Sequence, residues 1–218
     1  MHLVSVNVGL PRDVTWKGKT VTTGIFKEST ADRVMIRSLN LDGDGQADLA
    51  VHGGRDKAVY AYPSEHYSYW REQVPDMDLP WGMFGENLTT VGLREDEVNI
   101  GDRFRIGAAE IVATEPRMPC YKLGIRFGRP EIVKQFQDSR LTGIYFAVVQ
   151  EGEIGLEDAI ELVSRDERHV TVADITHLYL DKNLDNPANR DLMTRAIQVE
   201  ALAAGWRDYF QQQLAKLA

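Results

Sequence analysis

The sequence predicts a mainly β domain, a barrel or a sandwich, over residues 1–165, followed by three short helices over residues 166–218. The first observation is that short runs rich in Val, Ile and Thr, bounded by Gly and Pro, follow one another through the first 165 residues. The second is that only two helical patterns interrupt these runs, which is typical of barrels and sandwiches. The third is that, beyond about Asp166, apolar residues recur every three or four positions instead.

The expected strands are short and separated by turn residues. They cover residues 2–8, 19–25, 34–41, 57–62, 87–90, 98–100, 103–106, 110–114, 143–149 and 159–163. A turn at Gly107 joins two of them, and Pro63 ends another because proline cannot donate to a ladder.

Two helices are expected among these strands. Ser64 is a candidate N-cap for a helix over residues 65–73, because its hydroxyl can accept from a free amide. Pro130 can open a second helix, in which Ile132 and Phe136 lie on one face.

The last 50 residues read as a small helical bundle. Thr171 is a candidate N-cap for a helix over 172–180, and helical patterns follow at 188–203 and 206–217. A bundle of this size buries little apolar surface by itself. We therefore expect it to pack on the β domain, or on a partner subunit in a homodimer.

Composition excludes several classes of protein. The net charge of −8 disfavours a nucleic-acid polymer as partner, since such proteins need a basic surface. We find neither an apolar run long enough to span a membrane nor the pattern of a signal peptide. A single cysteine excludes an internal disulfide and an iron–sulfur cluster held by this chain's own thiolates, and is typical of a cytoplasmic protein.

That cysteine lies in a stiff, cationic segment. Cys120 follows Pro116, Arg117 and Pro119, and precedes Lys122. The prolines restrict the backbone, and nearby cations favour the thiolate, which is the form that attacks substrates or binds metals. The residues alone leave an inert buried cysteine as the alternative.

Three further features are candidates for ligand binding, the first of them for an anion. His52, Gly53 and Gly54 precede Arg55 and Lys57, and two glycines allow a ligand to approach the backbone closely; a simple polar turn is the alternative. Lys27 is a cation at a strand end, and a solvated surface lysine is the alternative. Glu86 and Asn87 can hydrogen-bond a heterocycle, although asparagine there is also a common turn residue.

Taken together, these motifs resemble the MOSC-domain family, named for the C-terminal domain of molybdenum cofactor sulfurases, and its YiiM-like branch in particular. The resemblance covers residues 20–165 in order and extends to the helical tail. The matching segments are His52-Gly53-Gly54 with Lys57-Ala58, Tyr62-Pro63 with Glu65-His66-Tyr67 and Tyr69-Trp70, Phe84 to Leu88, Gly101-Asp102 with Phe104, Pro116-Arg117 with Pro119 to Leu123, and Glu161 to Arg165.

The resemblance implies a MOSC-type β-barrel that binds a molybdenum cofactor, with Cys120 as the protein ligand to the metal. A soft thiolate suits a metal already held by sulfur. The cofactor's phosphate requires a local basic pocket in an acidic chain. Its expected residues are Lys27, His52, Gly53, Gly54, Lys57, Arg117 and Lys122, and Asn87 is expected to contact the pterin or its phosphate.

The resemblance also implies a reaction. Members of this branch are associated with the reduction of N-hydroxylated bases, such as 6-hydroxylaminopurine, to amines. Two electrons and two protons are consumed and the oxygen leaves as water. Because the chain has one cysteine and no cysteine-rich extension, we expect the electrons to come from a separate reductase.

Two other hypotheses remain open at this point. The first is a cofactor-binding or sulfur-carrying module without turnover of its own. The second is a metal-free thiol enzyme in which Cys120 is the nucleophile and His52 its base.

Overall fold

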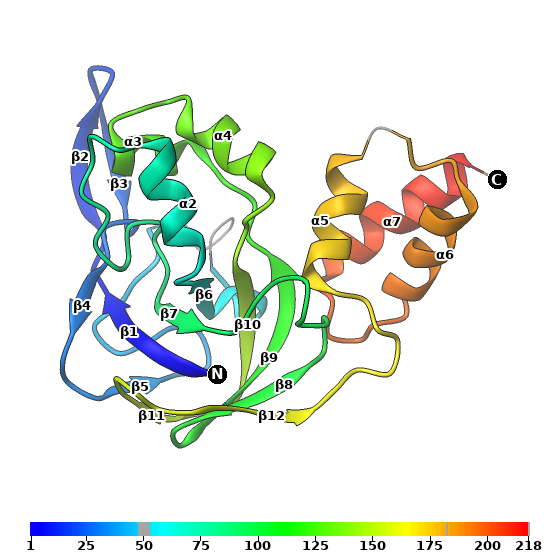
Figure 1. Ribbon diagram of the computed structural model, residues 1–218, viewed down its shortest axis with the longest axis horizontal. Coiled ribbons are helices and arrows are strands. Elements are labelled where there is room, and N and C mark those ends of the chain that lie inside the picture. The colour runs from blue at the N-terminus through cyan, green and yellow to red at the C-terminus, as the bar shows by residue number, and fades with distance from the viewer. Residues whose placement is uncertain (48–52, 182, 218) are drawn as a thin grey trace.

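The computed structural model describes residues 1–47, 53–181 and 183–217. A strongly curved sheet forms the centre of the molecule, with the helices α2, α3 and α4 at one end of it and the helices α5, α6 and α7 grouped beside it (Figure 1). Of our sequence predictions, His52 lies outside the described residues.

The main sheet has eight strands in the order β12-β8-β9-β10-β6-β7-β1-β4. Neighbouring strands are antiparallel, except that β6 and β7 are parallel. A parallel pair needs a crossover, and α2 lies in the segment that provides it. The strands are β1 (His2–Val8), β4 (Glu28–Thr30), β6 (Val59–Pro63), β7 (Leu88–Val91), β8 (Arg103–Ile106), β9 (Ala109–Pro116), β10 (Ile144–Gln150) and β12 (Ile160–Ser164).

The mainly β class is confirmed, but the expected MOSC-type β-barrel was wrong. The sheet is open, and β12 and β4 are its two edges. Its curvature brings the turn before β12 against the start of β1, where His2 and Ala159 form a single bridge and the Leu3 amide donates to Asp158. A single bridge is not a continuous ladder of hydrogen bonds, so the sheet is curved but does not close into a barrel.

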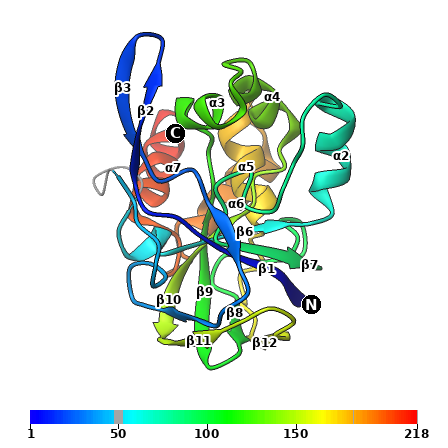
Figure 2. The same ribbon diagram turned by 90° about the vertical axis from the view of Figure 1, so that its left-hand side faces the viewer.

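Two smaller β structures accompany the main sheet. The strands β2 (Arg12–Trp16) and β3 (Lys19–Thr23) form a hairpin that extends away from the body (Figure 2). Its two turn residues, Lys17 and Gly18, both have positive φ angles, as a tight hairpin turn requires. The strands β5 (Val34–Ile36) and β11 (Gly152–Ile154) pair separately.

The helices near the sheet follow the predictions in part. The helix α2 (His66–Gln73) has no side-chain cap, so the predicted capping by Ser64 was wrong. The helix α4 (Ile132–Ser139) confirms the apolar face with Ile132 and Phe136, which are both buried. The helix α3 (Tyr121–Phe127) was not predicted, and a short 3₁₀ turn, η1, covers Arg55–Lys57.

The C-terminal helical segment is confirmed. Thr171 and Asp174 form the capping box of α5 (Val172–Leu180), and Asn186 caps α6 (Pro187–Ala196), which is shorter than expected. The helix α7 (Ala204–Lys216) includes Gly205. Leu178, Met193 and Phe210 belong to the same buried cluster as the inner side chains of the sheet, so the segment packs on the β domain. The predicted boundary at residue 165 and the predicted homodimer stay predictions.

A second buried cluster lies on the other side of the molecule, among the aromatic side chains of β6, α2 and α4. Tyr62 stacks on Phe84 and Phe136, and its hydroxyl accepts from Trp70. Leu123 and Phe127 of α3 also belong to this cluster, so it holds α3 against the end of the sheet. In the part of the chain that is described, no helix has the length and apolarity needed to cross a membrane.

Candidate functional site

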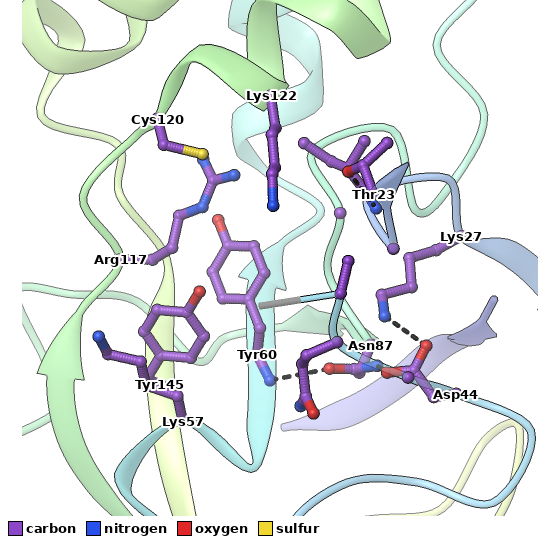
Figure 3. A pocket seen from close by; sticks show the side chains of 16 residues that line it. Thr23, Lys27, Asp44, Lys57, Tyr60, Asn87, Arg117, Cys120, Lys122 and Tyr145 are labelled. Atoms are coloured by element: carbon purple, nitrogen blue, oxygen red, sulfur yellow. Dashed lines mark hydrogen bonds and ion pairs between the residues drawn. The ribbon is translucent and has the colours of Figure 1, made fainter. Parts of the chain in front are cut away.

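One cavity collects most of the residues that the sequence singled out. We call it the thiol cavity, and its walls come from β3, β6, β10, the start of α3 and the loops around residues 44–47 and 85–87 (Figure 3). Its lining residues are Thr23, Gly24, Ile25, Lys27, Asp44, Gly45, Gln46, Ala47, Lys57, Tyr60, Gly85, Asn87, Arg117, Cys120, Lys122 and Tyr145.

Cys120 is held at the N-cap position of α3, where its backbone is extended. The carbonyl of Cys120 accepts from the Leu123 amide, which fixes the first turn of the helix. The thiol is half-buried and lies beside the Arg117 guanidinium (Figure 3). The segment from Pro116 to Pro119 therefore leads directly to the cysteine, whose sulfur faces the cavity.

Arg117 is a buried cation at the floor of this cavity. Its side chain is 6% exposed and packs over the rings of Tyr60 and Phe136, at 5.4 and 5.3 Å from their centroids. Its Nη1 atom has no hydrogen-bond partner, and it forms no ion pair with a carboxylate, among the described residues. A buried charge without a partner is costly, so the site is suited to an anion.

The charge on Arg117 is nevertheless retained. Burial acts to lower its pKa, but Tyr60, Tyr145 and Cys120 act in the opposite direction, and the net effect raises the pKa of Arg117. The guanidinium is thus cationic at neutral pH.

Tyr60 and Tyr145 were missed by sequence reasoning. They face each other across the β6–β10 ladder, with ring centroids 5.2 Å apart. Burial raises the pKa of both hydroxyls, so both are neutral donors. The Tyr60 hydroxyl donates to the Thr142 carbonyl, at 2.9 Å. The two tyrosines could be found together only from the pairing register of β6 and β10, and no single segment of the sequence reveals that register.

Lys27 lies in the cavity, but its charge is compensated. It forms a buried ion pair with Asp44, whose other oxygen accepts from Asn87 Nδ2 at 2.9 Å. Burial lowers the pKa of Lys27, and Asp44 opposes that shift. Asn87 also accepts from the Tyr60 amide at 3.2 Å. Lys27 and Asn87 therefore belong to one polar network that shapes the wall opposite Cys120.

Glu86 does not contribute to the cavity. It is fully buried and accepts from the Tyr67 hydroxyl and from the amides of Gly82 and Phe84. Burial raises the pKa of Glu86, while these donors oppose the shift. The sequence-based suggestion that Glu86 contacts a heterocycle was wrong, because its hydrogen bonds hold the turn before β7.

The remaining predicted residues divide between two cavities. Lys122, on the first turn of α3, and Lys57, at the end of η1, line the thiol cavity. Gly53 and Gly54 do not; they line an adjacent cavity that shares Lys57 with the first. Gly54 has φ of 94°, which a residue with a side chain rarely adopts.

The described residues include no cluster of three or more His, Cys, Asp or Glu that could hold a metal ion. A metal ion in the thiol cavity would therefore need most of its ligands from a cofactor. One soft thiol, a guanidinium that has no carboxylate partner among the described residues, and the ammonium group of Lys122 suit such a cofactor if it is anionic.

Two family models match separate parts of the chain. A model of the MOSC domain matches residues 48–161, and a model of the YiiM-like 3-alpha helix domain matches residues 170–217. YflK from Bacillus subtilis is 39% identical over 215 residues, which are 99% of this chain and 95% of that protein.

Two further relatives differ in how much of their length is shared. The crystal structure of YiiM from Geobacillus stearothermophilus has a TM-score of 0.79 and 35% identity, and the match covers 97% of this chain and 98% of that one. A protein named reductase from Gibberella moniliformis is 34% identical over 151 residues, which are 68% of this chain and 27% of that longer protein.

Proposed function

Because this chain belongs to the YiiM-like branch of the MOSC-domain family, we propose that it is a molybdenum-cofactor oxidoreductase that reduces N-hydroxylated compounds to amines. MOSC domains are in general associated with the molybdenum cofactor. One relative of this chain is named a reductase. Both facts support an oxidoreductase that uses this cofactor.

The observation that carries the proposal is the pairing of Arg117 with Cys120. Arg117 is buried, cationic and has an unsatisfied Nη1 atom, and no carboxylate neutralises it among the described residues. An anionic cofactor would supply the missing acceptor, and a thiolate beside a cation would supply a soft ligand.

The roles of the other residues follow from their positions. When bound, the cofactor would supply two-electron chemistry that breaks the N–O bond. Cys120 Sγ would be the protein ligand to molybdenum. Arg117 and Lys122 would bind the anionic groups of the cofactor, and Lys57, Lys27 and Asn87 would complete the wall around them.

The two tyrosines have a role in orientation under this proposal. Burial keeps the hydroxyls of Tyr60 and Tyr145 protonated. A neutral hydroxyl donates a hydrogen bond without adding charge to a site already rich in charge. We assign Tyr145, whose ring lies between Arg117 and Lys57, to donate to the oxygen of the N-hydroxyl group (Figure 3).

The electrons are proposed to come from a separate reductase. The single cysteine is assigned to the metal, and the 218 residues contain no G-x-G-x-x-G fingerprint of a dinucleotide site. The proposed protein therefore accepts electrons from a partner and delivers them to the substrate.

The test measures metal and turnover on the same samples. The full chain, produced in a host that makes the cofactor, should contain molybdenum and should reduce an N-hydroxylated base with reduced viologen as donor. Cys120→Ser should fold but lose turnover, because a neutral hydroxyl is a poor ligand for this metal. Molybdenum without turnover would indicate a carrier, and turnover without molybdenum would contradict the proposal.

A further inference from the structure

A second cavity lies between the β domain and the C-terminal helices. We call it the interdomain cavity; its volume is about 430 Å³, within the range of roughly 300–1,000 Å³ that small-molecule sites occupy. Lys57 lines both this cavity and the thiol cavity, so the two adjoin. Its other lining residues are Gly53, Gly54, Arg55, Asp56, Glu115, Met118, Tyr179, Ala203, Ala204, Gly205, Trp206 and Tyr209.

Glu115, near the end of β9, is the polar group that most needs a ligand there. It is 6% exposed, and its Oε2 accepts from Trp206 Nε1 at 2.5 Å. Its Oε1 forms an ion pair with Lys57 Nζ at 3.8 Å, but it accepts no hydrogen bond from the described residues. A buried carboxylate oxygen left in this state is costly. It would be satisfied by an N–H group inside the cavity.

The wall beside Glu115 is aromatic. Trp206 meets Tyr179 and Tyr209 edge to face, with centroids 5.1 and 6.4 Å away, and stacks on Phe210 on the core side. Tyr179 is 42% exposed although it is a large ring on a packed helix. Aromatic rings that open onto a cavity bind planar rings by stacking.

We propose that the interdomain cavity binds the planar nitrogen heterocycle of the substrate. Glu115 Oε1 accepts from an N–H group of the ring, and the ring stacks on the aromatic wall. The N-hydroxyl group extends past Lys57, which lines both cavities, into the thiol cavity. This inference rests on the proposed function and adds to it the place where the ring of the substrate binds, between β9 and the helices α5 and α7. The C-terminal helices are then part of the substrate site.

Binding of adenine, the amine that corresponds to an N-hydroxylated purine, tests the inference by calorimetry on the full-length holoprotein. Glu115→Gln should weaken adenine binding about tenfold, because a charge-assisted hydrogen bond becomes a neutral one. Tyr179→Ala, at a half-exposed position that leaves the core intact, should also weaken it about tenfold through lost stacking. Glu110→Gln, on the same strand but outside both cavities, is the control and should bind like the wild type.

Cofactor content is measured in each sample, so that a loss of cofactor is not mistaken for a loss of the ring site. Reduced binding in Glu115→Gln and Tyr179→Ala, at unchanged cofactor content, supports the inference. Absent binding in the wild type, or binding that both variants leave intact, overturns it. Turnover of an N-hydroxylated base with reduced viologen is read separately and decides the proposed function, so either proposal can fail alone.

Discussion

Arg117 combines burial, positive charge and an unsatisfied donor in one side chain. Structural guanidinium groups of this kind normally pair with a carboxylate, and breaking such a pair is strongly destabilising. Here the variant Arg117→Met would remove a charge that has no acidic partner among the described residues. Its effects on stability and on ligand binding should therefore separate.

We predict that Arg117→Met leaves the free energy of unfolding of the cofactor-free protein unchanged or increased, while the affinity for the cofactor falls about ten- to a hundredfold. Chemical denaturation measures the first quantity and molybdenum content the second. Arg105→Met, at an exposed position on β8, is the matched control. A large loss of stability together with full cofactor content would show that Arg117 has a structural role instead.

The buried carboxyl of Glu115 makes the free energy of unfolding depend on pH, and the direction follows from the shift of its pKa. Burial is the largest cause that raises the pKa of Glu115, and Lys57 and Trp206 oppose the shift in part. A carboxyl whose pKa is raised in the folded state binds its proton more tightly when folded. It therefore lowers stability as pH rises above the ordinary value of 4.5 and through the folded pKa.

Glu115→Gln removes this titration and keeps an acceptor for Trp206. The variant should gain stability relative to the wild type at pH 7. The difference should shrink as pH falls through the raised pKa of the folded state, and it should vanish below 4.5, where Glu115 is protonated in both the folded and the unfolded wild type. Unfolding by denaturant across this pH range measures the difference. A gain that is the same at pH 4 and pH 7 would contradict the assignment to the Glu115 carboxyl.

Among the secondary-structure elements, the helix α7 holds the C-terminal segment against the sheet. Phe210 is fully buried in the main hydrophobic cluster. Trp206, one turn earlier, donates a hydrogen bond to Glu115 on β9. Removing residues 166–218 would uncover this apolar surface of the β domain, so the truncated chain should aggregate.

A point variant gives the same test in a folded chain. Phe210→Ala should cost about 3–5 kcal/mol of stability, the usual range for a buried phenylalanine. Gln212→Ala, at an exposed position on the same helix, should stay within about 0.5 kcal/mol of the wild type. Equal stability of the two variants would show that α7 does not depend on this contact.

Elements with a complete local signal could be predicted from the sequence. Thr171 caps α5 as expected, and Ile132 and Phe136 mark the buried face of α4. The helix α3 was missed because Gly124 interrupts its seven residues and no side-chain cap precedes it. Its position depends instead on Leu123 and Phe127, which pack into the aromatic cluster. Tertiary packing outweighed local propensity there.

The candidate site was predictable only where a motif carried it. Cys120, Arg117 and Lys122 lie within one short segment and were found together. Tyr60 and Tyr145 come from strands that are 85 positions apart in sequence, and they meet only through the register of β6 and β10. Local sequence patterns likewise could not predict that the sheet is open, because closure depends on whether its two edge strands pair along their length.

At the scale of the whole molecule, the proposal requires an external source of electrons. The purified chain should show no turnover with NADPH alone and should show turnover with reduced viologen, because no dinucleotide fingerprint or cysteine cluster is present in the sequence. Spectrophotometric rates with each donor decide this. Sustained NADPH-driven turnover by the pure chain would reveal a nucleotide site and contradict the requirement for a reductase partner.

The central claim is that Cys120 binds molybdenum, and X-ray absorption at the molybdenum edge tests it most directly. The wild-type holoprotein and a Cys120→Ser sample loaded with the same cofactor would be compared. Our account predicts one fewer sulfur around the metal in Cys120→Ser. An identical sulfur count in the two samples would show that the thiol of Cys120 is not a ligand.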